Sequence, residues 1–182
     1  QCFCLSPGFS DYARALRAFD GRLSPIDLFY EQCCYQDEWE CQLMMQDADL
    51  LSQCGILLNN PHNPTGSLFT RELVQRLLSQ FALVVVDEAF MDFLPPDRQQ
   101  SVIEWVGDSE SNSANLVVVR SLTKFYSMPG IRLGYAIAHP TTIQRWQQWR
   151  DAWPVNTLAA AAGIAALQDS SFQWQTWQWL KA

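Results

Sequence analysis

Short runs that are apolar at every position, each followed at once by polar residues, constrain the fold of this chain most. Three of them are 55–58 (GILL), 83–86 (LVVV) and 116–119 (LVVV). A strand without polar alternation has both faces covered, as in a parallel sheet. The segments 71–80 and 157–167 have leucines or alanines at helical spacing. The sequence therefore predicts an α/β domain of three layers, with a mostly parallel sheet flanked by helices.

The same patterns predict further elements. Residues 2–5 indicate a strand, and 135–138 indicate another. Residues 11–19 favour a helix with Ser10 as its N-cap. The 157–167 helix is apolar nearly all round, which predicts that it is buried.

Polar residues follow three of the apolar runs directly. The runs end at Asn59 and Asn60, at Asp87, and at 121–124. In parallel α/β sheets, ligands bind beyond the carboxyl ends of the strands. We therefore expect these polar residues to share one edge of the sheet and to form the functional site.

Size, charge and cysteine spacing exclude several classes of protein. A chain of 182 residues is long enough for one domain with a substantial core. Its net charge of −7 argues against a nucleic-acid-binding surface. No apolar run approaches the ~20 residues of a membrane span. The six cysteines have neither a CxxC pair nor zinc-type spacing, so we predict no metal site and reduced thiols in a cytoplasmic protein.

Two residues carry the chemical hypothesis. Asp87, after a buried strand, is either a turn residue or a carboxylate that pairs with a cationic ligand atom. Lys124 is either solvated or, among the apolar neighbours Leu122 and Phe125, a neutral amine that attacks a carbonyl to form a Schiff base. Ser121 and Arg132, near glycines, could clamp a phosphate. A carboxylate, an amine and a phosphate clamp together suit pyridoxal phosphate.

Three motifs in this order resemble the class I and II aminotransferases, which are fold-type-I pyridoxal-phosphate enzymes. They are NPHNPTG at 60–66, VVVDEAF at 84–90 and SLTKFYSMPGIRLGY at 121–135. The segment 7–16, PGFSDYARAL, is similar to the histidinol-phosphate aminotransferase branch. The resemblance covers essentially the whole chain, and three ordered motifs are far more specific than one.

The resemblance implies roles at matching positions. Lys124 matches the lysine that forms the Schiff base and moves protons at the substrate α-carbon. Asp87 matches the aspartate that pairs with the protonated pyridine nitrogen. Asn63 matches the asparagine that donates to the ring hydroxyl. Ser121 and Arg132 match the phosphate ligands.

Phe9 matches the aromatic residue that stacks on the cofactor ring. Phe90 departs from the pattern, because many relatives have a tyrosine there that bonds the ring hydroxyl. The family's phosphate loop lies upstream of Phe9, and its small domain follows the region matched here. We therefore expect residues 1–182 to be the incomplete large domain of a longer protein.

The wording of the motifs most resembles the L-threonine O-3-phosphate decarboxylases of cobalamin synthesis. Histidinol-phosphate aminotransferases are the alternative, and a non-catalytic truncated remnant is a reading from another class. A nucleotide-binding domain is a third option, without a GxGxxG or Walker-type loop in its support. The resemblance implies a phosphorylated amino acid or amine as substrate, no nucleic acid or membrane partner, and a cytoplasmic homodimer when full length.

Overall fold

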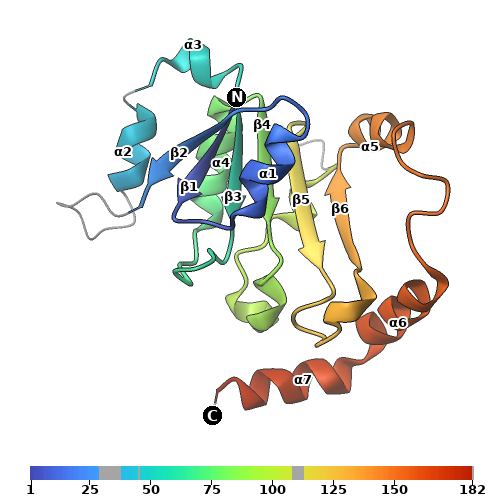
Figure 1. Cartoon of the computed structure of the whole chain (residues 1–182). Helices are drawn as coiled ribbons and strands as arrows, with labels where there is room; N and C mark the ends of the chain where they lie inside the picture. The colour runs from blue at the N-terminus through green and yellow to red at the C-terminus, as the bar shows by residue number, and fades with distance from the viewer. Residues whose placement is uncertain (29–37, 45, 108–112, 182) are drawn as a thin grey trace.

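The computed structural model describes residues 1–28, 38–44, 46–107 and 113–181. These residues form one sheet with the strand order β2-β1-β3-β4-β5-β6 (Figure 1). The strands are β1 Cys2–Ser6, β2 Leu23–Asp27, β3 Gly55–Asn59, β4 Leu83–Asp87, β5 Leu116–Ser121 and β6 Gly134–Ala138. Neighbouring strands pair in parallel, except that β6 runs antiparallel to β5. The predicted α/β class with a mostly parallel sheet is confirmed.

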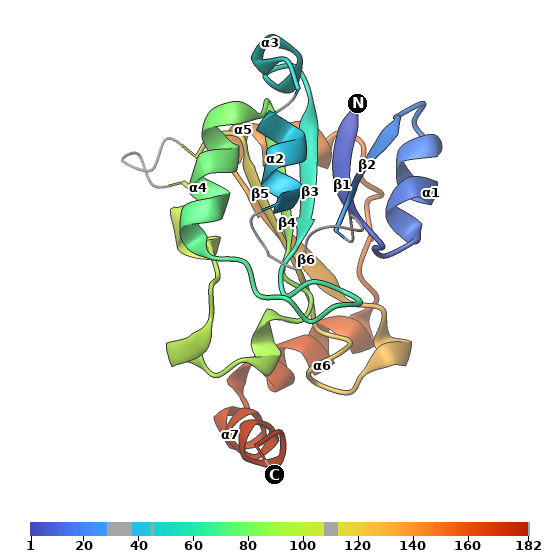
Figure 2. The same ribbon diagram turned by 90° about the vertical axis from the view of Figure 1, so that its left-hand side faces the viewer.

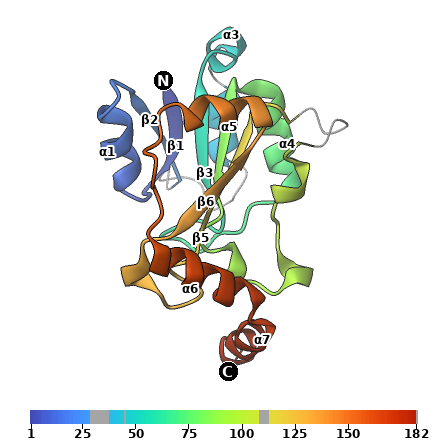
Figure 3. The same cartoon turned by 90° about the vertical axis from the view of Figure 1, so that its right-hand side faces the viewer.

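Helices cover both faces of this sheet. They are α1 Asp11–Arg17, α2 Glu38–Met44, α3 Ala48–Leu51, α4 Arg71–Gln80, α5 Pro140–Gln147, α6 Thr157–Gln168 and α7 Ser170–Trp179. Figures 2 and 3 show α1 on one face, with α2 and α4 on the other. Helices α6 and α7 lie beyond the carboxyl end of β5. Short 3-10 turns stand at Met91–Phe93, Pro96–Arg98, Ile103–Trp105 and Pro129–Ile131.

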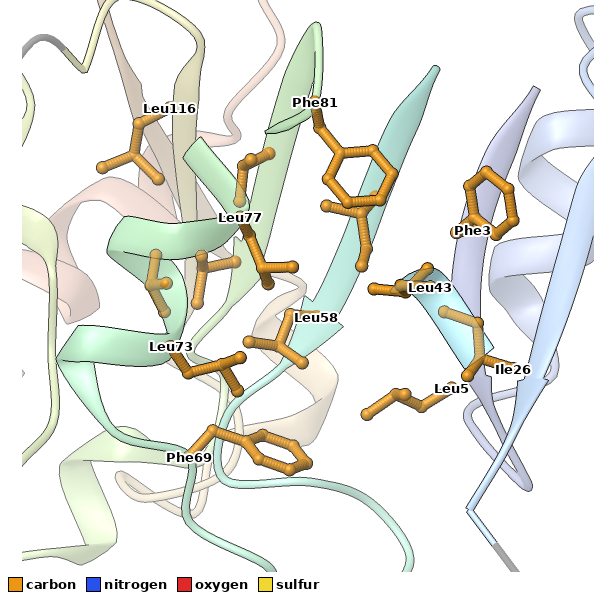
Figure 4. Close-up of a cluster of buried hydrophobic side chains, with 14 of the residues drawn as sticks. Phe3, Leu5, Ile26, Leu43, Leu58, Phe69, Leu73, Leu77, Phe81 and Leu116 are labelled. Atoms are coloured by element: carbon orange, nitrogen blue, oxygen red, sulfur yellow. The ribbon is translucent and has the colours of Figure 1, made fainter. Parts of the chain in front are cut away.

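The main core lies between the sheet and the α2–α4 face (Figure 4). Leu58 and Val86 of the central strands are fully buried, and Leu73 and Leu77 of α4 pack against the same cluster. Each such side chain contributes about 1.5–3 kcal/mol when it leaves water. The hydroxyl of Thr70 caps α4 by accepting from the backbone N–H of Leu73 at 3.4 Å. The core therefore fixes β3, β4 and β5, the three strands that end at the predicted site.

Two details of the predicted helices are wrong. The 157–167 helix forms as α6, but of its residues, all of which the structure describes, Ala159 and Gly163 are the buried ones. Leu158 is 76% exposed and Ile164 is 61% exposed. Apolar periodicity predicted the helix but could not show what covers it. Ser10 precedes α1 in helical geometry and makes no side-chain cap bond.

Strand β2 does not follow from an apolar run, since its sequence is LSPID. It is an edge strand beside β1, and proline is tolerated at a sheet edge. In the part of the chain that the structure describes, no helix has the length and apolar character needed to cross a lipid bilayer.

Candidate active site

The carboxyl ends of β3, β4 and β5 meet at one edge of the sheet, as expected. Asn59 pairs with Asp87 in the register of β3 and β4, and Asp87 pairs with Val119 of β5. The side-chain amide of Asn59 donates to the carbonyl of Asp87 at 2.9 Å, and its oxygen accepts from the backbone N–H of Asn63 at 2.7 Å. Asn59 thus joins the Asn63 turn to the Asp87 strand end.

The Asp87 carboxylate has two donors from this chain. Its Oδ1 accepts from the backbone N–H of Ala89 at 3.0 Å, and its Oδ2 accepts from the Tyr12 hydroxyl at 2.5 Å. Burial, together with the negative charge of Asp87, raises the pKa of Tyr12. Tyr12 therefore stays protonated at neutral pH and donates its hydroxyl hydrogen to Asp87.

Sequence reasoning did not identify Tyr12 as a site residue. It lies in the first turn of α1, and its ring meets the edge of the Phe9 ring at a centroid distance of 5.3 Å. The available signal was the spacing of three between Phe9 and Tyr12, which on one helical turn directs both rings to one side. Phe9 itself is 46% exposed.

Lys124 lies beside Ser121 and Phe90. Its Nζ is 3.3 Å from the Ser121 Oγ and 5.3 Å from the centroid of the Phe90 ring. The Ser121 Oγ also lies 2.8 Å from the Thr123 Oγ1. The amine is thus held by a hydroxyl and a ring face, a contact of the cation–π type.

The expected apolar surroundings of Lys124 are a point where the structure differs. The side chain of Lys124 is exposed, whereas Leu122 and Phe125 are buried in a separate cluster with Tyr126. In this turn, neighbouring side chains point in opposite directions. The buried apolar residues therefore anchor the turn after β5 and leave the Lys124 amine accessible.

Asp87 and Lys124 lie on the same face of the sheet. Asp87 is in register with Val119, and side chains alternate along a strand, so Asp87 and Ser121 point to the same side. Tyr12 of α1 reaches Asp87 from that side, and Lys124 reaches Ser121. The carboxylate and the amine therefore lie on the same side of the sheet, at the ends of the neighbouring strands β4 and β5.

Arg132 lies two residues before β6, the strand that pairs antiparallel with β5. The backbone N–H of Leu122 donates to the carbonyl of Leu133 at 3.1 Å, and Ser121 pairs with Gly134. A Cβ at Gly134 would lie 2.7 Å from the carbonyl oxygen of Arg120, so this close approach requires glycine. The Arg132 guanidinium donates to the Pro129 carbonyl at 2.9 Å and is otherwise exposed.

Asn63 lines a cavity of about 340 Å³ between its own turn and the segment that follows Asp87. Phe90 and Phe93 line the other side. The buried His62 holds the turn: its Nδ1 lies 2.9 Å from the Thr65 Oγ1, and burial lowers its pKa so that the ring is neutral at pH 7. A cavity of this size and lining suits a small organic group.

A larger cavity of about 570 Å³ lies along β6 and α5. Arg132, Tyr135 and Arg150 line it, but among the described residues around it there is neither a carboxylate nor a lysine. We therefore place the chemistry at the strand ends rather than in this larger space. In the described part of the chain, no cluster of three His, Cys, Asp or Glu residues could hold a metal ion.

The groups at the strand ends fit one kind of ligand. An anionic carboxylate suits a cationic ring nitrogen, and an accessible amine suits a carbonyl. A serine hydroxyl at the end of β5 and an arginine shortly before the paired strand β6 suit a phosphate. The exposed aromatic ring of Phe9 suits stacking on another ring. The structure thus places Asp87 on the same sheet face as Ser121 and Lys124, which contact each other. Asn63 lines the smaller cavity, whereas Arg132 lines the larger one.

Comparison with known proteins identifies the family of this chain. Residues 2–181 match the family described as aminotransferase class I and II. The chain is 36% identical to the threonine-phosphate decarboxylase of Salmonella typhimurium, over 100% of this chain and 48% of that protein. It is 35% identical to histidinol-phosphate aminotransferase 2 of Legionella pneumophila (strain Paris), over 74% of this chain and 36% of that protein. The resemblance predicted from the three motifs is confirmed.

Solved structures share the fold. The histidinol-phosphate aminotransferase of Sinorhizobium meliloti, determined in complex with pyridoxal-5'-phosphate, superposes with a TM-score of 0.76 at 24% identity. That comparison covers 97% of this chain and 46% of the other. The chain likewise spans about half the length of the curated relatives it matches, 48% of the decarboxylase being covered.

Proposed function

This chain belongs to the class I and II aminotransferase family, and on that premise we propose that residues 1–182 form the cofactor-binding domain of a pyridoxal-phosphate enzyme. The observation that carries this proposal is the placement of Lys124 beside Ser121, on the face of the sheet that presents Asp87. A non-catalytic remnant has no need to keep, on one face of the sheet, an accessible amine and a carboxylate that accepts two hydrogen bonds.

Bound pyridoxal phosphate supplies a conjugated ring that accepts the electron pair left at the substrate α-carbon when a bond there breaks. The residues of this chain hold and orient that ring. Asp87 pairs with the ring nitrogen and stabilises its protonated form, while Phe9 stacks on the ring. Ser121 and Arg132 bind the phosphate, and Asn63 donates to the ring hydroxyl.

Lys124 has a second task as the group that moves a proton at the α-carbon. The contacts of its Nζ atom with the Ser121 hydroxyl and the Phe90 ring place the amine at the carboxyl end of β5. In a decarboxylase it returns a proton to the α-carbon after carbon dioxide has left. In an aminotransferase it first removes the α-proton.

Of these two reactions we propose decarboxylation of L-threonine O-3-phosphate to (R)-1-amino-2-propanol O-2-phosphate, a step of cobalamin synthesis. The support is the 36% identity to a threonine-phosphate decarboxylase over the whole chain. The alternative is transamination of histidinol phosphate, supported by 35% identity over a shorter stretch. Both substrates are phosphorylated amino compounds, so the same cofactor site serves either reaction.

One assay separates the two activities. We expect the full-length protein, incubated with threonine phosphate, to release carbon dioxide in proportion to the substrate consumed. Incubated with histidinol phosphate and 2-oxoglutarate, it should form no glutamate above background. Glutamate formation without carbon dioxide release would reject the decarboxylase and support the aminotransferase.

Tyr12→Phe tests the carboxylate's support. A hydrogen bond to a charged group contributes about 1.5–3 kcal/mol, so turnover should fall by roughly tenfold or more. The fall should appear in kcat, because Tyr12 contacts Asp87 rather than the substrate. Tyr126→Phe removes a hydroxyl that bonds Gln173 in a different cluster, and it serves as the control. Equal kcat values for the two variants would contradict the role given to Tyr12.

We also propose a cytoplasmic homodimer for the full-length protein, as the resemblance implies. Apolar side chains around α6 and α7 support a further covering surface, since Trp153 and Trp179 are 90% and 75% exposed. Light scattering on the full-length protein should give twice the mass of its chain. The mass of a single chain at micromolar concentration would reject the dimer.

A further inference from the structure

A cluster of charged side chains lies buried behind the strand ends. The Arg120 side chain is 6% exposed, and that of its partner Glu88 is fully buried. The Nε and Nη2 atoms of Arg120 lie 2.8 and 2.7 Å from the Glu88 Oε2. Arg120 also donates through Nη1 to Asp92, and through Nη2 to the Ser101 hydroxyl at 2.9 Å.

Two charged members of this cluster, Glu88 and Arg120, are each next to a residue of the proposed site. Glu88 follows Asp87 directly, and Arg120 directly precedes Ser121. The backbone N–H of Glu88 donates to the carbonyl of Val119 at 2.8 Å, which adds a main-chain bond between the same two strand ends. The cluster therefore joins the segment that carries Asp87 to the segment that carries Ser121 and Lys124.

The cluster acts from the face opposite the site. Side chains alternate along a strand, so Arg120 points away from the side on which Val119 and Ser121 lie. Its contacts with Glu88 and Ser101 are on that other side. It therefore does not contact the reacting atoms and can influence them only through the backbone.

Hydrogen bonds to both oxygens hold the Glu88 carboxylate in one orientation. Its Oε1 accepts from the backbone N–H of Val102 at 2.9 Å, and its Oε2 accepts from the Ser101 hydroxyl at 2.7 Å as well as from Arg120. The planar guanidinium supplies several donors in a fixed geometry. Because apolar residues of similar volume often stabilise a fold as well as a buried ion pair does, stability alone does not account for this cluster.

We propose that Arg120 and Glu88 are positioning residues, which set the spacing between the carboxylate of Asp87 and the Ser121–Lys124 turn across the cofactor. This inference rests on the proposed pyridoxal-phosphate function. A cofactor that paired with Asp87 through its ring nitrogen and contacted Lys124 and Ser121 through its carbonyl and phosphate groups would span both strand ends, so the spacing of the two ends would have to match it. Asp92 contributes by anchoring Arg120 to the 3-10 turn that follows Phe90.

The test uses variants of the full-length protein that avoid an unpaired buried charge. Arg120→Lys keeps the charge but loses the planar fork. A triple variant, Glu88→Gln with Asp92→Asn and Arg120→Met, removes the charges altogether. Leu77→Ala, in the core on α4, is the control for loss of stability without a change at the site. The melting temperature of each is measured, and all are compared well below the lowest of these.

Three quantities are then measured for each variant. Titration of the cofactor-free protein with pyridoxal phosphate gives the dissociation constant of the cofactor, and steady-state assays give kcat and KM. We expect both Arg120 variants to weaken cofactor binding by about tenfold and to lower kcat by about 100-fold, since a 1 Å misplacement has an effect of that size. KM should stay within about twofold of the parent value. Leu77→Ala should keep the parent's cofactor affinity.

Two outcomes would overturn the inference, and they differ in meaning. If the Arg120 variants match Leu77→Ala in cofactor affinity and kcat, the cluster is structural and this inference is wrong, while the proposed function stands. If the parent protein itself binds no pyridoxal phosphate, the proposed function fails, and this inference fails with it.

Discussion

Lys124→Ala is expected to lower turnover by about 10²–10⁴-fold, the range in which positioned proton transfer contributes to catalysis. The structure places the amine of Lys124 beside Ser121 and above the Phe90 ring, accessible from the face that presents Asp87. Within residues 1–182 the other lysine is Lys181, in the C-terminal segment. Steady-state turnover of the full-length protein measures the effect.

Lys181→Ala is the matched control for that prediction. Lys181 is exposed and follows α7, and it has no role in the proposed site. Its removal should leave turnover unchanged within about twofold. A small amine added to Lys124→Ala should restore part of the activity, because the missing group is a nucleophile and base rather than a structural support. Full activity of Lys124→Ala would show that the proton is moved by another group.

Asp87→Asn is expected to lower kcat by about 10²–10³-fold, comparable to the loss of other preorganised electrostatic contacts. Asparagine has nearly the same shape, and its oxygen can still accept from the backbone N–H of Ala89 while its amide group donates to the Tyr12 oxygen. It carries no negative charge to stabilise a protonated ring nitrogen. The phosphate ligands and Lys124 are untouched. Cofactor affinity should therefore fall far less than kcat.

Asp97→Asn is the control for Asp87→Asn, since Asp97 lies exposed on a 3-10 turn. Both variants are titrated with pyridoxal phosphate and then assayed at saturating cofactor. A parent-like kcat for Asp87→Asn would remove the carboxylate from the proposed chemistry. A loss of cofactor affinity as large as the loss of kcat would show that Asp87 acts in binding rather than in turnover.

Short-range patterns were enough to predict the central sheet and its site edge. In the run 83–86, Val84 and Val86 are fully buried and Val85 is partly buried, whereas Leu83 at its start is 40% exposed. The next residue, Asp87, lies where the apolar run ends. The helix at 71–80 was predicted with its observed bounds, since its leucines repeat at the spacing that faces a core.

Features that depend on long-range contacts could not be predicted in this way. Strand β2 contains Pro25 and alternating polar residues, and its assignment depends on its pairing with β1. The exposure of α6 depends on what packs against it. The bond between Tyr12 and Asp87 joins residues 75 positions apart, and no local pattern indicates which face of α1 meets which strand end.

Reduction of the cofactor-loaded, full-length protein with borohydride tests the central claim most directly. Borohydride fixes pyridoxal phosphate on the lysine to which it is bound, and peptide mapping then identifies that lysine. The account predicts that the label lies on Lys124 and that it is absent from Lys124→Ala. A label on any other lysine, or no label on a protein saturated with the cofactor, would contradict it.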